Sequence, residues 1–524
     1  MKQNLIAPAL LAASLLSGTA SAQVAERPKL VLVIVVDQFR YDYTTRFRAD
    51  YHGGLARMLD QGAVFTDARY VHFPTVTAVG HSTVMSGATP SVSGIIGNDW
   101  YDRVAAKSVT SVSDDEAKLV GGVPGVTGSS PRKLLVSTFA DELKMAGRAA
   151  KVVGISIKDR SAILPVGHTA NGAYWFDNDS GHWVTSSYYT SDLPQWVQQL
   201  NAGHPTGKYL GADWLPLRAK EGAKPYCSLV AGKGDVPYCG SIEATPFGNE
   251  LIEEMAEQAL VNEQLGKHSG TDVLAVSFSS NDYAGHALGP DHPAIRDISI
   301  RTDILLGKLM DAIDAQVGAG NTLAVLTADH GVAPTPEDQA ARNMPGGRID
   351  PSAFAKSITN ALNAKFGDGK WIVSDANNVI YLDYKTVADK KADPAVVRLA
   401  AADAARVFPH IARVYTRDAL LEGDAPVDAV GRAVKLGFYG PRSGDVTPVP
   451  EPYWFFSTGS TGTTHSTPYG YDNHVPMLWL GSGIKPGVYN QSATVNDIAP
   501  TLAAIFAVET PSGSSGRILR EILK

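Results

Sequence analysis

The chain has little cysteine, no surplus of positive charge and no long apolar run beyond its first residues. The spacing of its two cysteines, in 524 residues, matches no zinc knuckle, so a thiolate metal site is not expected. Lys and Arg number 46 against 53 for Asp and Glu, which argues against nucleic acid as the main partner. No later segment is apolar enough to predict a membrane span, and we find no internal repeat or low-complexity tract.

The first 22 residues have the features of a secretory signal peptide. Met1 and Lys2 precede a run of Leu and Ala that continues to Leu16, and small residues, Thr-Ala-Ser-Ala, occupy positions 19–22. This order is typical of a leader that is cleaved on export, and the apolar stretch is too short for a membrane anchor. We expect a mature chain that begins at Gln23 and is periplasmic or secreted.

The two cysteines, Cys227 and Cys239, flank a loop of eleven residues. In an exported chain a disulfide is the expected fate of such a close pair. Closing so short a loop contributes about 3 kcal/mol, mostly by restricting the unfolded chain.

Apolar runs alternate with amphipathic segments along most of the chain. The segments 248–266 and 295–315 have helical periodicity. Runs with the composition of buried parallel strands lie at 30–36, 151–156, 271–278 and 321–327. Such alternation predicts an α/β fold with a central, mostly parallel sheet flanked by helices.

Two segments break this alternation. One, at about 171–244, is rich in Trp, Tyr, Gly and Ser, and the other spans about 336–450. A mature chain of this length exceeds one simple core, so we expect one domain over residues 23–524 with two insertions that rise over the sheet edge. The aromatic residues of the first insertion suggest a surface for a nucleoside or an aromatic ester, although core packing explains them equally well.

Six potential metal ligands follow the predicted strands or lie farther along the chain: Asp37, Asp282, His286, Asp329, His330 and His465. Asp37 and Asp329 each follow a predicted strand, so both carboxylates should lie at the carboxyl edge of one sheet, where open α/β sheets bind ligands. Asp282 and His286 are four residues apart, which places them on one side of a helical turn. A single such Asp can equally be a helix cap, but the set of carboxylates and imidazoles favours catalytic zinc.

A hydroxyl nucleophile is expected in the segment 73–87, FPTVTAVGHSTVMSG. Thr77 should stand where a loop enters a helix, whose free N–H groups and positive dipole end suit a phosphoryl oxygen. A hydroxyl ionises far above neutral pH, so it needs a metal to become an attacking oxygen. A plain helix cap would also explain Thr77, and competing hydroxyls in the segment are those of Thr75, Ser82 and Thr83.

Lys158 and Arg160 follow the predicted strand 151–156. If the segment is extended, residues two apart lie on the same side of it, and a cationic pair there suits the non-bridging oxygens of a phosphoryl group. The alternative is an ordinary pair of solvated charges.

Seven motifs, in order, resemble those of the alkaline phosphatase superfamily: VVDQFRYD, PTVTAVGHST, IGNDWYD, SIKDR, SSNDYAGH, TADHG and GTTHSTPYGYDNHVPM. Within the superfamily the chain is most similar to the bacterial periplasmic alkaline phosphatases of the PafA/PhoK type, which use a threonine nucleophile. The motifs run from Asp37 to Pro476, so the resemblance covers nearly the whole mature chain.

This resemblance implies a site with two zinc ions. One ion would be held by Asp282, His286 and His465. The other would be held by Asp37, Asp329 and His330, with Thr77 as a further ligand and the nucleophile. The phosphoryl group would be bound by Asn98, Lys158 and Arg160. The implied reaction is hydrolysis of small-molecule phosphate monoesters through a phosphothreonine.

Two other histidines lie in these motifs. His474 is close to His465 in the sequence and could reach the same sheet edge, but the resemblance favours His465 because it follows the Gly-Thr-Thr run. His81 is expected to pack and to form hydrogen bonds rather than bind metal.

Three other classes of protein share some of these features. A sulfatase would need a Cys or Ser in a C/S-x-P-x-R segment, and the segment that starts at Thr77 contains neither Pro nor Arg. A nucleotide pyrophosphatase or phosphodiesterase has the same ligands and a threonine but generally lacks the Lys and Arg pair. A non-catalytic zinc-binding protein would tend to have His-rich tracts, whereas the 13 histidines here are scattered.

Overall fold

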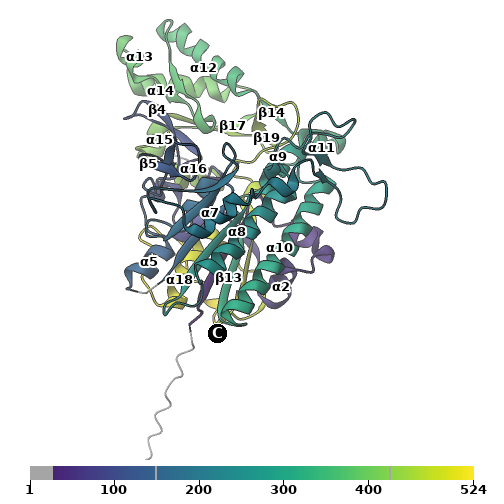
Figure 1. Cartoon of the computed structure of the whole chain (residues 1–524). Helices are drawn as coiled ribbons and strands as arrows, with labels where there is room; N and C mark the ends of the chain where they lie inside the picture. Colours follow the sequence, from purple (N-terminus) through teal and green to yellow (C-terminus); the bar gives the residue numbers. More distant parts are fainter. Residues whose placement is uncertain (1–26, 148–149, 424–426) are drawn as a thin grey trace, which may run out of the picture.

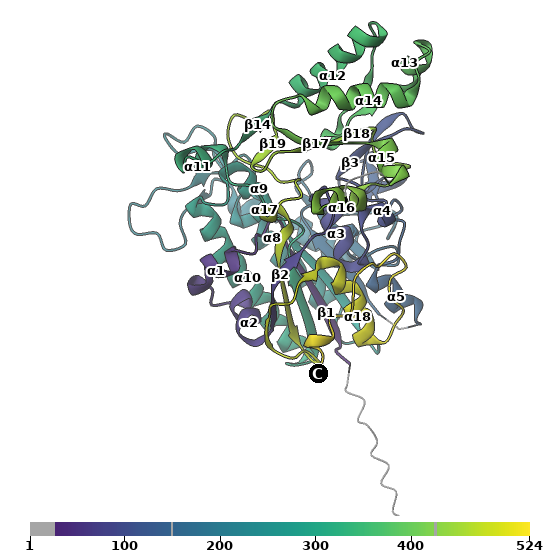
Figure 2. The ribbon, with the colours of Figure 1, turned by 180° about the vertical axis from the view of Figure 1, so that it is seen from behind.

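A twelve-stranded mixed sheet forms the centre of the molecule, with helices on both faces (Figures 1 and 2). The computed structural model describes residues 27–147, 150–423 and 427–524, and the proposed signal peptide lies outside them. The strand order is β21-β2-β20-β13-β1-β12-β7-β8-β9-β5-β6, and β22 pairs with β2. The predicted α/β fold with a flanked central sheet is therefore confirmed.

Five neighbouring strands in the middle of the sheet run parallel: β13 (Thr322–Thr327), β1 (Leu30–Val36), β12 (Asp272–Phe278), β7 (Val152–Ser156) and β8 (Gly172–Asp177). Every side chain of β1 is buried, as expected for a strand covered on both faces. These strands contain all four of the predicted apolar runs.

The flanks of the sheet are partly antiparallel. β20 (His474–Gly481) pairs antiparallel with β13 and with β2 (Ala63–Arg69). On the other side, β9 (His182–Ser186) pairs antiparallel with β8 and β5 (Ser113–Val120). The remaining strands of the sheet are β6 (Thr127–Ser129), β21 (Gly487–Tyr489) and β22 (Ala493–Thr494).

Two sets of helices cover the sheet. Figure 1 shows one set in front, formed by α2 (Gly54–Gln61), α8 (Pro246–Asn262) and α10 (Pro293–Val317). Figure 2 shows the other set, formed by α3 (Thr77–Ser86), α5 (Phe139–Met145) and α18 (Ile498–Phe506). Both predicted helices exist as α8 and α10, and each begins two residues earlier than its periodicity indicates because a proline occupies the first turn.

The segment expected to form the first insertion begins inside the sheet. Residues 172–186 form β8 and β9, which extend the central sheet instead of rising over its edge. Aromatic residues are common in strands, so composition alone does not distinguish strands of the central sheet from a hairpin in a cap. The rest contains α7 (Gln195–Ala202), β10 (Asp213–Trp214) and β11 (Cys227–Ser228). The predicted Cys227–Cys239 disulfide is present.

Most of the second expected insertion packs around a hydrophobic core of its own. This core includes Phe354, Trp371 and Val397, all with at most 1% exposure. Its elements include α12 (Pro351–Phe366), α13 (Tyr384–Asp389), α14 (Pro394–Arg406), β17 (Ile411–Thr416), β18 (Val446–Pro450) and β19 (Trp454–Phe456). α12 and α14 lie at the end of the molecule opposite the C terminus (Figures 1 and 2). The limits of both insertions remain predictions.

Within the described ranges, none of the helices combines the length and the apolar character that crossing a membrane requires.

Candidate active site

Buried acids stand where the central parallel strands end. Asp37 directly follows β1 and Asp329 lies two residues after β13, and neither has any exposed surface. β1 and β13 are neighbours, so the two carboxylates meet at one edge of the sheet. The next strand, β12, leads into α9 (Ser280–Leu288), which carries Asp282 and His286 on one turn.

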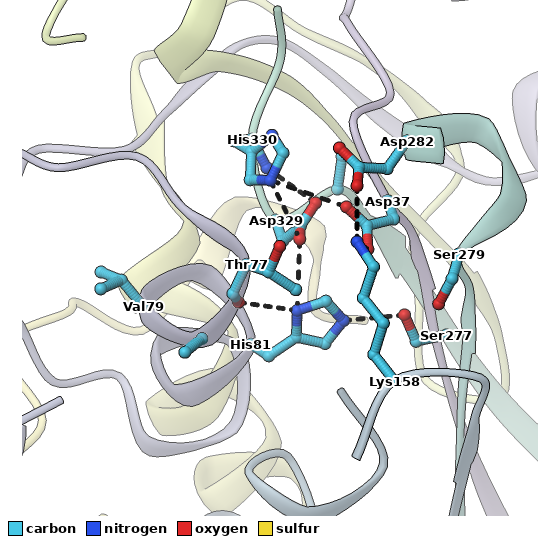
Figure 3. Close-up of polar contacts among 12 residues, drawn as sticks. Asp37, Thr77, Val79, His81, Lys158, Ser277, Ser279, Asp282, Asp329 and His330 are labelled. Carbon is cyan, nitrogen blue, oxygen red and sulfur yellow. Dashed lines mark hydrogen bonds and ion pairs between the residues drawn. The ribbon is translucent and has the colours of Figure 1, made fainter. Parts of the chain in front are cut away.

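Two groups of three side chains have the spacing of metal sites. In the first, ligand atoms of Asp282, His286 and His465 lie within 4.8 Å of one another. In the second, the same holds for Asp37, Asp329 and His330. The structure thus brings together all six residues that the sequence indicates as ligands (Figure 3 shows four of them).

The three histidines of these groups present the same nitrogen to the carboxylates. Nδ1 of His286, His330 and His465 lies 2.8–2.9 Å from a backbone carbonyl. A carbonyl can only accept, so each Nδ1 carries the proton and each Nε2 keeps its lone pair. The Nε2 atoms lie 3.2–3.7 Å from oxygens of the acids in their own groups. This backbone anchoring of the second ring nitrogen is typical of metal-ligating histidine.

Several ligand atoms are left without a hydrogen bond to the described residues. Asp37 Oδ1, Asp329 Oδ2 and His330 Nε2 are buried and form no hydrogen bond within the described part of the chain. Burial raises the pKa of Asp37 well above its usual value, and the neighbouring Asp329 raises it further. Buried acceptors that face one another in this way need a cation, so the residues of the second group fit a metal ion.

Gln38 connects the two groups, and sequence reasoning missed it. Its backbone N–H donates to Asp329 Oδ1 at 3.1 Å, and its side-chain amide donates to Asp282 Oδ1 at 2.6 Å. Its backbone is left-handed, with φ 60°. A polar residue directly after the strand-end Asp37 was the available signal, but its partners lie 244 and 291 residues away.

Thr77 is the first residue of α3, as predicted, and is almost fully buried. The competing hydroxyls of Thr75, Ser82 and Thr83 each donate to a backbone carbonyl at 2.9 Å. The Thr77 hydroxyl has no such bond to any described residue, so it is the one left available at the start of the helix.

Asn98 stands against the same helix end. Its Oδ1 accepts the N–H of Ala78 at 2.8 Å, which is the residue after Thr77. The Asn98 carboxamide is therefore fixed beside the Thr77 backbone, with its amide nitrogen still able to donate.

Lys158 and Arg160 do not form an extended pair, and that part of the prediction is wrong. Lys158 is extended, but α6 (Asp159–Ile163) begins at the next residue, so Arg160 lies on a helix. The chain leaves β7 through only two intervening residues, too few for an extended segment. Lys158 Nζ bonds Asp37 Oδ2 at 2.7 Å and Asp282 Oδ2 at 2.6 Å (Figure 3). The Arg160 guanidinium contacts only Asp159, at 3.9 Å, and its Nε has no partner among the described residues.

The two remaining histidines have structural contacts. His474 lies at the start of β20, where its Nε2 bonds the Thr66 carbonyl at 3.0 Å and its ring stacks on Tyr41. His81 is fully buried, and its Nδ1 lies 2.8 Å from the Thr77 carbonyl and 3.3 Å from Asp329 Oδ2. It therefore holds the helix end and a ligand carboxylate together (Figure 3).

Known proteins share this fold. A family model described as type I phosphodiesterase / nucleotide pyrophosphatase matches residues 31–474. The alkaline phosphatase PafA of Elizabethkingia meningoseptica is 36% identical, and the match covers 98% of each chain. The crystal structure of wild-type PafA has a TM-score of 0.89 at 36% identity, and the match covers 95% of this chain and 99% of that one.

A PafA variant is similarly close, with a TM-score of 0.88 at 35% identity over 95% of this chain and 99% of that chain. In that variant a Thr is replaced by Ser, and an Asn, a Lys and an Arg are replaced by Ala. The chain described here therefore belongs to the type I phosphodiesterase/nucleotide pyrophosphatase family and is, within it, an alkaline phosphatase of the PafA type.

Proposed function

We propose that the protein is an exported phosphomonoesterase that carries two zinc ions and forms a phosphothreonine at Thr77. The observation that carries the proposal is the pair of three-residue groups of acids and histidines that meet at the sheet edge beside the start of α3. Their nitrogen and oxygen atoms, without thiolate, suit zinc in a catalytic site. When bound, the two ions would supply Lewis-acid stabilisation of negative charge on the reacting oxygens.

The chain's own residues supply the nucleophile and position the phosphoryl group. The Thr77 hydroxyl gives its proton to water, and its oxygen bonds to phosphorus while the bond from phosphorus to the leaving oxygen breaks. The leaving oxygen takes up a proton from water, so the alcohol departs with no net gain or loss of protons. A water molecule then hydrolyses the phosphothreonine, which restores the Thr77 hydroxyl and releases inorganic phosphate. The N-terminal N–H groups of α3 favour the added negative charge near Thr77.

Asn98 and Arg160 are proposed to bind the non-bridging oxygens, together with Lys158. The Asn98 amide stands beside Ala78, and among the described residues the Arg160 guanidinium pairs only with Asp159, at 3.9 Å. The residue types replaced in the PafA variant occur here, in the same order, as Thr77, Asn98, Lys158 and Arg160. Charge-assisted bonds of this kind are the strong ones.

Export is proposed from the leader-like residues 1–22 and agrees with the Cys227–Cys239 disulfide, since such bonds persist in oxidising compartments. The expected substrates are small-molecule phosphate esters, and the second insertion is proposed to frame the entrance to the site.

The second candidate function is a nucleotide pyrophosphatase or phosphodiesterase, because the matching family model carries that description. Steady-state rates on one monoester and one diester with the same leaving group, 4-nitrophenol, decide between the two. We expect a higher kcat/KM on the monoester. A native enzyme that is faster on the diester would favour the phosphodiesterase.

A further inference from the structure

A cleft of about 250 Å³ adjoins the candidate site. Asn98, His286 and His465 line one side of it, so a phosphoryl group held by these residues would border the cleft. The other side is formed largely by the second expected insertion and β19. All residues of the segment 171–244 are described, and none of them lines the cleft. The aromatic residues of that segment therefore take no part in this cleft.

The cleft is apolar on the wall formed by β18 and β19. Phe455, Phe456 and Pro450 line this wall, and Phe73 lies on the side of α3. The Phe456 ring is half-buried and packs edge-on against Phe354, with ring centroids 5.2 Å apart. A ring held in this way offers a fixed aromatic surface to a ligand.

A short 3₁₀ turn, η4 (Ala376–Asn378), closes the cleft beside Asn98. The Asn377 side chain donates to the Asp99 carbonyl, so the turn is tied to the residue next to Asn98. Asn378 also lines the cleft, and its left-handed backbone has φ 62°. The carboxamide of Asn378 forms no hydrogen bond to any described residue, which leaves it free to bond a ligand.

The segment 464–467 also lines the cleft, and other residues fix it in place. Asp472 accepts bonds from the Thr467 N–H at 2.8 Å and from the Thr467 hydroxyl at 2.6 Å. Ser466 has a left-handed backbone, φ 92°, a conformation that persists only where surrounding structure enforces it. The cleft is thus built from restrained segments on both sides.

No carboxylate, ammonium or guanidinium group lines this cleft among the described residues. A charged leaving group that entered it would lose hydration without meeting an opposite charge. A planar apolar group would instead bury its surface against Phe456, and its polar edge could bond Asn378. We propose that the cleft is the leaving-group subsite and that it selects phosphate monoesters of uncharged alcohols with a planar ring, aryl alcohols or nucleosides. This inference rests on the proposed function.

The test compares alcohols of similar acidity. We expect the native enzyme to hydrolyse benzyl phosphate with a kcat/KM about tenfold above that for 4-carboxybenzyl phosphate, because one unfavourable group in a pocket typically has an effect of this size. Phe456→Ala should lower kcat/KM for benzyl phosphate about tenfold more than for methyl phosphate. Adenosine 5′-monophosphate against ribose 5-phosphate repeats the comparison for a nucleoside. A selective loss in only one of the two series assigns the cleft to that class of alcohol.

Phe408→Ala is the matched control. Phe408 also packs edge-on against Phe354, at 5.3 Å, but does not line the cleft, so its removal should leave the benzyl to methyl ratio unchanged. Equal rates on the benzyl and carboxybenzyl esters would overturn the inference. So would losses in Phe456→Ala that are equal within both series, that is, equal on benzyl and methyl phosphate and equal on adenosine 5′-monophosphate and ribose 5-phosphate. An enzyme inactive on every monoester, methyl phosphate included, would instead overturn the proposed function.

Discussion

The ammonium nitrogen of Lys158 lies 2.7 Å from a carboxylate oxygen of Asp37, and the same nitrogen lies 2.6 Å from Asp282. Asp37 and Asp282 belong to different ligand groups, so one buried lysine joins both. Burial alone would lower the pKa of Lys158, but the two carboxylates outweigh it and raise the pKa. The lysine therefore stays charged and partly neutralises the acids of the site.

This contact predicts that Lys158 stabilises the metal-free protein. Lys158→Met leaves buried carboxylates without their cation, so the free energy of unfolding of chelator-treated protein should fall by roughly 3 kcal/mol. The measurement is urea unfolding with and without zinc. Bound zinc should reduce the difference in the free energy of unfolding between the native protein and Lys158→Met. Lys308→Met is the control, because Lys308 bonds Glu253 and Glu257 with 55% of its side chain exposed, and such pairs contribute about 1 kcal/mol or less. Similar losses in both variants would contradict the buried role.

The ligands divide into two groups of three, so the protein should retain two zinc ions per chain. Elemental analysis after mild dialysis measures this directly. His286→Ala and His330→Ala each remove a ligand from a different group, and each variant should retain about one ion. A native protein with one metal or none and full activity would refute the two-zinc proposal.

Thr77→Ala should abolish phosphoenzyme formation while much of the phosphate affinity survives, since the ligands, Asn98 and Arg160 remain. Acid trapping with labelled substrate measures the intermediate. Direct binding of inorganic phosphate to the variant measures the phosphate affinity. Thr83→Ala is the control, because the Thr83 hydroxyl bonds the Val79 and Ala88 carbonyls. Label found on Thr75 or Ser82 would identify a different nucleophile.

The sequence predicted the acids of the site because local pattern determines their place. A short, fully apolar run rich in β-branched residues favours a buried strand, and parallel strands put their carboxyl ends at one edge, which placed Asp37 and Asp329. The four-residue spacing of Asp282 and His286 likewise survives as one turn of α9. Only the family resemblance singled out His465, because it lies in a loop whose position depends on contacts such as that of its Nδ1 with the Thr75 carbonyl.

Features that depend on distant contacts were not predictable. The contacts of Gln38 and the position of Asn377 beside Asp99 join segments more than 200 residues apart. The composition of the aromatic segment at 172–186 does not distinguish a cap from strands that extend the sheet. The pairing of Lys158 with Asp37 and Asp282 depends on where β7 lies in the sheet.

His72 predicts a pH-dependent loss of stability. It is buried, neither ring nitrogen has a partner among the described residues, and burial lowers its pKa to about 3. The unfolded chain protonates near the ordinary value of about 6.5, so this contribution to stability is present above pH 6.5 and is lost as pH falls toward 3.

His72→Phe keeps an aromatic ring at this position and removes the two unpaired ring nitrogens. The free energy of unfolding should rise by about 1–2 kcal/mol at pH 7.5, and the gain should be about 2 kcal/mol larger at pH 5. Urea unfolding at both pH values measures this, with exposed His204→Gln as the control. A gain that does not change with pH would show that His72 is not the titrating group.

Arg160 predicts which ester the enzyme prefers. A monoester dianion presents one more bare, charged oxygen than a diester, and a guanidinium can hold such an oxygen through charge-assisted hydrogen bonds. In a diester that oxygen carries a second substituent, so the same guanidinium contributes little. Arg160 has only the 3.9 Å contact with Asp159 to give up, and 26% of its side chain is exposed, so the group is available to a ligand.

Arg160→Ala should therefore lower monoesterase kcat/KM by roughly a hundredfold, the usual effect of removing one donor from an electrostatic site. Diesterase kcat/KM should fall much less, which narrows or reverses the preference, and adding Lys158→Ala should widen the difference. Paired assays of 4-nitrophenyl phosphate and its methyl diester measure the ratio. Arg342→Ala is the control, because Arg342 pairs with Asp291 outside the candidate site. Equal losses on both esters would mean that Arg160 only positions the start of α6 and does not bind the phosphoryl group.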